Sequence, residues 1–119
     1  METETKNAII TDAIITNDDH GVLSSWIYLD YGGSGQGFGG YCLYQPNFRN
    51  ESPNIAGHFI WRVMEVIGVS KWSDLKGKTI RAVSTHDKVV KIGHIVKNIW
   101  FDPSQEFSDM KSSNDLPKD

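Results

Sequence analysis

A short polar group beside a glycine-rich run carries most of the chemical potential of this 119-residue chain. Asp30 and Tyr31 precede the run, and Ser34 and Gln36 lie inside it. Glycine has no Cβ, so the backbone N–H and C=O groups of such a run are open to close approach. If the run borders a pocket, we expect these four residues to form its wall and to contact a ligand or a partner.

Asp19 and His20 form a second polar pair, in a dense turn cluster that ends at Gly21. Carboxylates and imidazoles are among the groups that proteins use for general acid–base catalysis. We expect this pair to lie across the first hairpin from Asp30, where His20 or Asp30 could transfer a proton. Two structural alternatives stay open. Turn carboxylates often bond their own backbone, and Asp30 could accept N–H groups of the turn that follows it.

Six glycines fall between Gly32 and Gly40, and four of them alternate along the chain. The segment 35–40 matches G-x-G-x-x-G, but a strand-like segment follows it where a dinucleotide site requires a helix. Alternation is the period of a strand, so one face of an extended stretch here is bare backbone. Two interpretations remain. Either the glycines serve packing, through sharp coiling or the close approach of a helix over 53–67, or the bare backbone faces a ligand.

The composition excludes several kinds of site. Cys42 is the only cysteine, so no intrachain disulfide can form, and we expect it to be a small core residue. The four histidines lack zinc-ligand spacing, and the sequence implies neither a metal nor another cofactor. The net charge of −3 argues against a nucleic-acid partner. No apolar run reaches the ~20 residues that span a membrane, so we expect no membrane partner.

The spacing of apolar and turn residues predicts an α+β fold. A curved antiparallel sheet of about five strands, in the order β-β-β-α-β-β, carries one long helix, and partial closure of the sheet is equally compatible. We expect one domain over 1–119, with residues 1–6 and 111–119 disordered. The expected elements are strands at 7–16 and 22–31, an extended stretch at 33–44, a helix at 53–67, a helical turn at 70–75, strands at 78–84 and 89–101 with a bend at Gly93, and a helical turn at 104–109.

Alternation within the strand 22–31 indicates which of its faces is buried. Ile27 and Leu29 mark the core side, because aliphatic residues at strand period line one face. The other face has a different character, with an aromatic pair and a carboxylate. It carries Trp26, Tyr28 and Asp30.

The ends of the long helix have clear signals. Ser52 followed by Pro53 is typical of an N-cap and a first helical position. Gly68 follows the last apolar residue of the helical stripe and is a C-cap candidate. The helix over 53–67 is therefore the best-defined element in the chain.

Several segments together resemble a known group of sequences. They are Asp19-His20-Gly21, residues 29–41 (LDYGGSGQGFGGY), residues 66–69 (VIGV), residues 72–78 (WSDLKGK), residues 92–95 (IGHI) and residues 100–103 (WFDP). This pattern resembles a family of small proteins encoded by phages and prophages, over roughly residues 15–103. The glycine segment is its most specific part. The resemblance implies a phage or mobile-element origin, and it assigns no catalytic residue because the family has no established activity.

These features predict a non-enzymatic accessory protein of a phage or prophage, located in the cytoplasm of the host cell. We expect an anti-defence or host-interaction factor that binds a host protein or a small ligand. One alternative is a small enzyme with an acid–base site at Asp30 and His20. Another is a virion or assembly component, in which copies of the chain associate, as in a homodimer, through a sheet edge.

Overall fold

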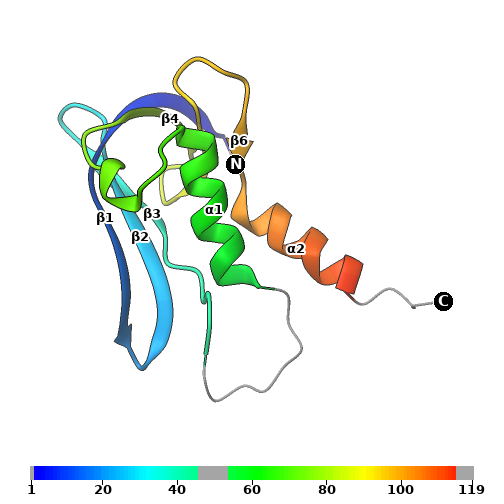
Figure 1. Cartoon of the computed structure of the whole chain (residues 1–119). Coiled ribbons are helices and arrows are strands. Elements are labelled where there is room, and N and C mark those ends of the chain that lie inside the picture. The colour runs from blue at the N-terminus through cyan, green and yellow to red at the C-terminus, as the bar shows by residue number, and fades with distance from the viewer. Residues whose placement is uncertain (1, 46–53, 115–119) are drawn as a thin grey trace.

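A computed structural model describes residues 2–45 and 54–114 of the chain. Within them, six antiparallel strands form one open sheet in the order β3-β2-β1-β4-β5-β6, with two helices beside it (Figure 1). The α+β class and the antiparallel sheet predicted from the sequence are confirmed. The elements are β1 (Glu4–Asp19), β2 (Val22–Asp30), β3 (Gly35–Gly39), α1 (Ile55–Ile67), a 3-10 turn (Trp72–Asp74), β4 (Thr79–Ser84), β5 (Val89–Gly93), β6 (Trp100–Phe101) and α2 (Pro103–Asn114).

The long strand β1 joins the two halves of the sheet. Its first part pairs with β4, and its remainder pairs with β2. The register shifts between Ile10 and Asp12, and such a bulge bends a strand and increases its twist. Residues 4–6, which the sequence assigns to a disordered end, pair with β4 instead. Backbone pairing with β4 explains why residues 4–6 are ordered, because it holds polar residues in place without a contribution from the hydrophobic core.

The segment 89–101 is not the single strand that the sequence predicts. β5 ends at Gly93, the chain leaves the sheet as a loop over 94–99, and it returns as the two-residue strand β6. The apolar residues of this segment continue through the loop, so hydrophobic pattern alone does not mark it. This division raises the number of strands from about five to six.

α2 is longer than the helical turn expected at 104–109, and it gives the fold a second helix. Asp102 caps it, because its Oδ1 accepts the N–H of Gln105 at 3.2 Å. Pro103 suits the first position, where a helix needs no N–H donor. The helix continues into the segment 111–119, which the sequence predicts as disordered and whose last five residues lie outside the described part of the chain.

α1 confirms the predicted long helix and its C-terminal end. Gly68 adopts a left-handed conformation with φ of 87°, as expected of a C-cap glycine. At the other end the Asn54 side chain accepts the N–H of Gly57 at 2.8 Å. The predicted starting residues Ser52 and Pro53 lie outside the described residues.

The core lies between α1 and one face of the sheet. Phe38 of β3 stacks on Phe59 of α1 with ring centroids 6.0 Å apart, and Phe59 meets Phe101 of β6 edge-on at 5.5 Å. Phe38 and Phe101 belong to the two edge strands, yet their centroids are only 6.2 Å apart. The sheet therefore curls until its edges approach each other. Ile27 and Leu29 are buried on this face, which confirms the predicted core side of β2.

A half-buried ion cluster attaches α2 to α1. Glu106 Oε1 accepts a hydrogen bond from Arg62 Nε at 2.9 Å and lies 2.8 Å from His58 Nε2. Arg62 also donates to the carbonyl of Trp100 at 2.7 Å, which links the cluster to β6. Burial alone would raise the pKa of Glu106, but the hydrogen bonds from Arg62 and His58 outweigh burial and hold the pKa below its ordinary value.

Replacing this carboxylate should make the protein less stable in a pH-dependent way. We expect Glu106→Gln to lower the free energy of unfolding by about 1–2 kcal/mol at neutral pH. The pKa of Glu106 is lower in the folded chain than in the unfolded chain. Its contribution is therefore complete above the unfolded pKa of about 4.3 and is lost as the pH falls through the folded value. Urea denaturation of both proteins should give stabilities that converge in acid.

Glu65→Gln is the matched control for this prediction. Glu65 also accepts a hydrogen bond from Arg62, at 2.6 Å, but its side chain is 47% exposed and it does not contact α2 through this cluster. Glu65→Gln should therefore lower the free energy of unfolding by less than Glu106→Gln does. A deficit of Glu106→Gln that stays constant from neutral pH into acid would contradict the assigned role.

Candidate functional site

The predicted site residues at the start of the glycine run form a tight hairpin turn. The N–H of Tyr31 donates to the carbonyl of Ser34 at 2.8 Å, and Gly32 and Gly33 between them have φ of 89° and 114°. Asp30 Oδ1 accepts the N–H of Gly32 at 2.8 Å. The carboxylate of Asp30 thus holds the turn, which is the structural alternative that the sequence left open, and Ser34 is exposed at the turn.

Gln36 connects the edge strand β3 to the turn between β4 and β5. Its Oε1 accepts the hydroxyl of Tyr31 at 2.6 Å, and its Nε2 donates to the carbonyls of Thr85 and His86 at 3.1 and 3.2 Å. Burial raises the pKa of the Tyr31 hydroxyl, so this phenol stays protonated and able to donate. The fold thus brings together Tyr31 and Gln36, two of the predicted site residues. Through Gln36 the pair links β3 to the turn between β4 and β5.

The structure does not bring Asp19 and His20 to the same place as Asp30. Asp19 pairs with Val22 at the first end of β2, whereas Asp30 is the last residue of that strand. The strand has nine residues, and its eight steps of about 3.3 Å each separate the two ends by roughly 26 Å. Proton transfer between two groups needs them within hydrogen-bond reach, and the structure does not bring Asp30 and His20 that close.

The bare face of the glycine run is covered by Trp26. A Cβ on Gly37 would lie 2.9 Å from Cε3 of this indole, and a Cβ on Gly40 would overlap the same ring. Gly39 has φ of 126°, and a Cβ there would overlap the carbonyl of Ser25. The helix expected on this face packs on the opposite one, against Phe38. The glycines therefore serve close packing, but against a side chain and the backbone of β2 rather than against α1.

The free edge of β3 presents the backbone groups of its glycines. The N–H of Tyr31 donates to Ser34 and the N–H of Gly40 donates to Ser25, so these are hydrogen-bonded pairs at the two ends of the β2–β3 ladder. In an antiparallel ladder, hydrogen-bonded pairs alternate with pairs that share no hydrogen bond. Counting from either end, Gln36 and Phe38 are the β3 residues whose backbone bonds to β2. The N–H and C=O groups of residues 35, 37 and 39 then point away from β2. No other strand of the described residues pairs with that edge.

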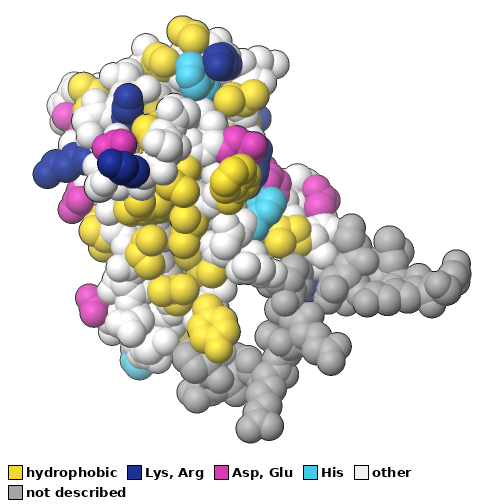
Figure 2. Space-filling model, viewed as in Figure 1, with side chains coloured by type: hydrophobic (Ala, Val, Ile, Leu, Met, Phe, Trp, Pro, Cys, Tyr) yellow, Lys and Arg dark blue, Asp and Glu magenta, His cyan; other side chains and the backbone are white. Residues whose placement is uncertain are grey.

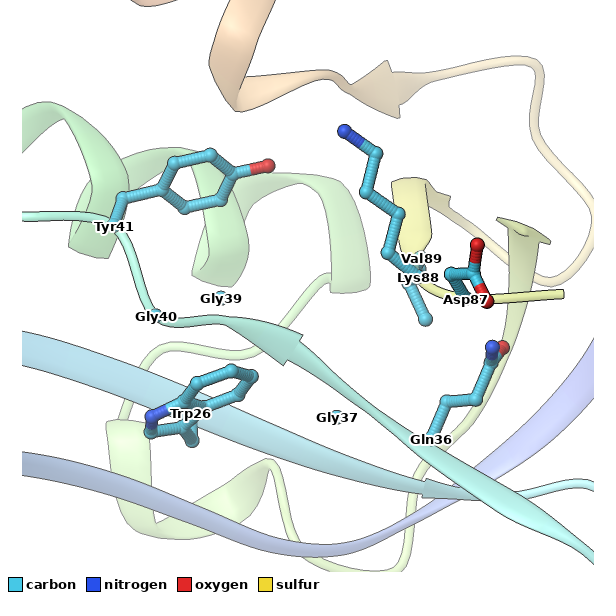
Figure 3. A pocket seen from close by; sticks show the side chains of 9 residues that line it. All are labelled: Trp26, Gln36, Gly37, Gly39, Gly40, Tyr41, Asp87, Lys88 and Val89. Atoms are coloured by element: carbon cyan, nitrogen blue, oxygen red, sulfur yellow. The ribbon is translucent and has the colours of Figure 1, made fainter. Parts of the chain in front are cut away.

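A groove of about 490 Å³ runs along this edge. Its far wall is formed by the end of the β4–β5 turn and by Val89, the first residue of β5. β6 pairs with β5 only further along, at Ile92 and Gly93. Figure 3 shows Trp26 and Tyr41 on opposite sides of the β3 chain, with Lys88 on the far wall. We call this feature the edge groove. It is lined by Trp26, Gln36, Gly37, Gly39, Gly40, Tyr41, Asp87, Lys88 and Val89.

Of the predicted site residues, Gln36 alone lines the edge groove. Asp30 and Tyr31 border a second, smaller cavity of about 270 Å³ beside β1. The sequence did not predict the wall formed by residues 87–89, because no pattern in the sequence indicates that this segment lies near β3, about 50 positions earlier. Cys42, expected in the core, is exposed, because the regular strand β3 ends at Gly39 and the neighbouring Leu43 is the residue that points inward beyond it.

Comparison with known proteins adds no further assignment. A scan of protein-family models, a search of curated proteins and a search of solved structures each found no match to this chain. Among the described residues, no group of three or more His, Cys, Asp or Glu side chains could hold a metal ion. No helix in the same part of the chain is long and apolar enough to cross a membrane.

The contact between indole and glycine can be tested directly. We expect Gly37→Ala to lower the free energy of unfolding by about 1–3 kcal/mol, since the added methyl group forces the Trp26 ring to move. In a Trp26→Ala background the same substitution should become neutral or stabilising, because alanine loses less backbone entropy than glycine. Chemical denaturation of the four proteins in this double-mutant cycle measures the coupling.

Tyr28→Ala provides the control background. Tyr28 stacks on Trp26 and lies on the same face of β2, but its nearest ring atom is at an ordinary 3.7 Å from the added methyl group. The cost of Gly37→Ala should persist in that background. Additive effects in the Trp26→Ala cycle would show that something other than the indole requires glycine at position 37.

Proposed function

We propose that this protein is a non-enzymatic binding protein that takes up an extended segment of a partner protein as an added strand in the edge groove. The observation that carries the proposal is the outer edge of β3 along the groove, with which no strand of the described residues pairs. Strand addition uses such an edge for main-chain hydrogen bonds and the neighbouring pockets for side chains.

Within the described part of the chain, β3 carries neither a charged residue nor a proline, and no further strand covers its outer edge. Natural sheets block their edges with lysine, proline or covering elements, because free edges invite pairing with other chains. The sequence of β3 is Gly-Gln-Gly-Phe-Gly, without charge or proline. Across the described residues, the edge is left open beside a groove whose volume lies in the usual range for ligand sites. An unprotected edge in this setting supports a binding role.

The glycines that line the groove favour the approach of an extended chain. Glycines at 37 and 39 place no side chain between the edge and an incoming backbone, so that backbone can reach hydrogen-bonding distance. The link from Gln36 to Thr85 and His86 holds the far wall in place before binding, which lowers the entropy cost of association. Lys88 and Asp87 supply charges of both signs for recognition of side chains.

The partner we favour is a host protein in the cytoplasm of a bacterial host. This choice rests on the resemblance to small phage and prophage proteins, whose segments include the glycine run. An anti-defence or host-interaction role follows from such binding. Catalysis at Asp30 and His20 is not part of the proposal, because opposite ends of β2 hold the two groups.

Amide exchange should reveal the free edge residue by residue. We expect the amides of Gln36 and Phe38 to exchange slowly and those of Gly37 and Gly39 to exchange fast, because only the former bond to β2. Peptides selected from a random display library against the whole protein should then slow exchange at Gly37 and Gly39. NMR exchange on the free and peptide-bound protein measures both patterns.

Matched variants locate the peptide in the groove. Tyr41→Ala and Lys88→Ala should weaken peptide binding about fivefold or more, and Lys111→Ala on α2 should leave it unchanged. A ligand that binds without protecting Gly37 and Gly39 would point to a small-molecule site instead. Protection that rises with protein concentration alone would assign the edge to a homodimer.

A further inference from the structure

The loop over 94–99 projects from the sheet between β5 and β6, at the upper end of the molecule in Figure 1. Val96 is 77% exposed, the largest exposed fraction among the large hydrophobic side chains of the described residues, and Ile99 is 39% exposed. Figure 2 shows hydrophobic, basic and histidine side chains gathered at the same end. Burial within the fold does not account for these aliphatic side chains.

Hydrogen bonds fix the shape of this loop. Nδ1 of His94 accepts the N–H groups of Val96 and Lys97 at 3.1 and 3.0 Å. Arg81 donates to the carbonyls of His94 and Lys97 at 2.8 and 2.7 Å. The indole of Trp100 donates to the Asn98 side chain at 2.9 Å. The apolar side chains are therefore held outward by an ordered backbone, which is a preorganised arrangement for binding.

Three cations lie in the loop or beside its base. The guanidinium of Arg81 and the ammonium of Lys91 lie 4.6 and 5.2 Å from the ring centre of Trp100, and Lys97 is in the loop itself. No salt bridge among the described residues involves any of the three. Three positive charges therefore lie at or beside this loop, in a chain whose net charge is −3. An anionic surface complements these charges.

We propose that the loop docks on an anionic lipid surface, with Val96 and Ile99 entering the interfacial layer and the three cations contacting headgroups. A protein partner is the poorer fit, because a loop of six residues offers far less than the roughly 800 Å² that each side of a stable protein interface buries. Interfacial binding needs only a few apolar side chains with basic neighbours. The sequence predicts no membrane partner because it has no long apolar segment, whereas an interfacial loop needs no such segment.

This site is separate from the edge groove. Val89 lines the groove at the first end of β5, whereas the loop follows Gly93 at the other end. The two surfaces can therefore be occupied together, and the failure of one proposal leaves the other standing. Variants in the loop should leave peptide binding in the groove unchanged.

Flotation of the full-length protein with lipid vesicles tests the proposal. We expect binding to phosphatidylcholine vesicles that contain phosphatidylserine, and not to vesicles of phosphatidylcholine alone. Val96→Asp should lower the partition coefficient about tenfold, because the inserted aliphatic group is lost. Lys97→Glu should lower it about fivefold or more, and added salt should weaken binding of the unaltered protein.

Two control variants match these changes at other places. Tyr44→Asp alters a side chain that is 58% exposed beside Leu23, and Lys111→Glu makes the same charge change on α2. Both should bind vesicles as the unaltered protein does, and thermal melts should confirm that all four variants fold. Equal binding to neutral vesicles, no binding to anionic ones, or binding that Val96→Asp leaves intact would each overturn the proposal. Self-association that Val96→Asp abolishes, without vesicle binding, would assign the loop to a contact between copies.

Discussion

The packing of the Trp26 indole on the backbone of Gly37 and Gly40 is the contact on which the position of β3 depends. A strand whose outer face has no side chains contributes no apolar surface of its own there, so a neighbouring strand must supply it. Tryptophan does so with a large flat ring, an arrangement known to compensate for glycine at sheet edges. With its outer face fixed in this way, β3 directs Phe38 into the core, where it meets α1 and β6.

The same device recurs on the opposite edge of the sheet. A Cβ on Gly93 would overlap the indole of Trp100, which lies directly across the β5–β6 pair. Arg81 and Lys91 lie against the same indole, and Arg81 also donates hydrogen bonds to two carbonyls of the 94–99 loop. Each of the two surfaces proposed for binding therefore lies beside a glycine whose missing side chain leaves room for a tryptophan ring. The constraint is steric in each case and involves few residues.

The sequence predicts what is local and leaves open what depends on distant partners. The helical stripe of α1, the left-handed Gly68 and the two faces of β2 follow from spacing within one element. Alternating glycines show that one face is bare, but they do not identify the object that covers it, and Trp26 enters only through the β2–β3 register. The wall at Asp87–Val89 follows His86, whose carbonyl accepts a hydrogen bond from Gln36, 50 positions earlier in the sequence. The separation of Asp30 from His20, in contrast, follows from strand length alone and was predictable.

The curl of the sheet explains why a groove exists at all. Phe38 and Phe101 draw the two edge strands toward each other, yet the hydrogen-bond ladder stays open between them. A side chain, Gln36, replaces backbone pairing at one end, where its amide reaches the β4–β5 turn. A side-chain bridge satisfies its own polar atoms, but it does not pair with the backbone groups of Gly37 and Gly39, and no strand of the described residues does so on that edge. Pairing of these groups with an added strand would exchange water contacts for ladder hydrogen bonds, and the favourable net energy of each exchange is modest, about 1 kcal/mol. Recognition at this edge must therefore come largely from the side chains that flank it, above all Trp26, Tyr41 and Lys88.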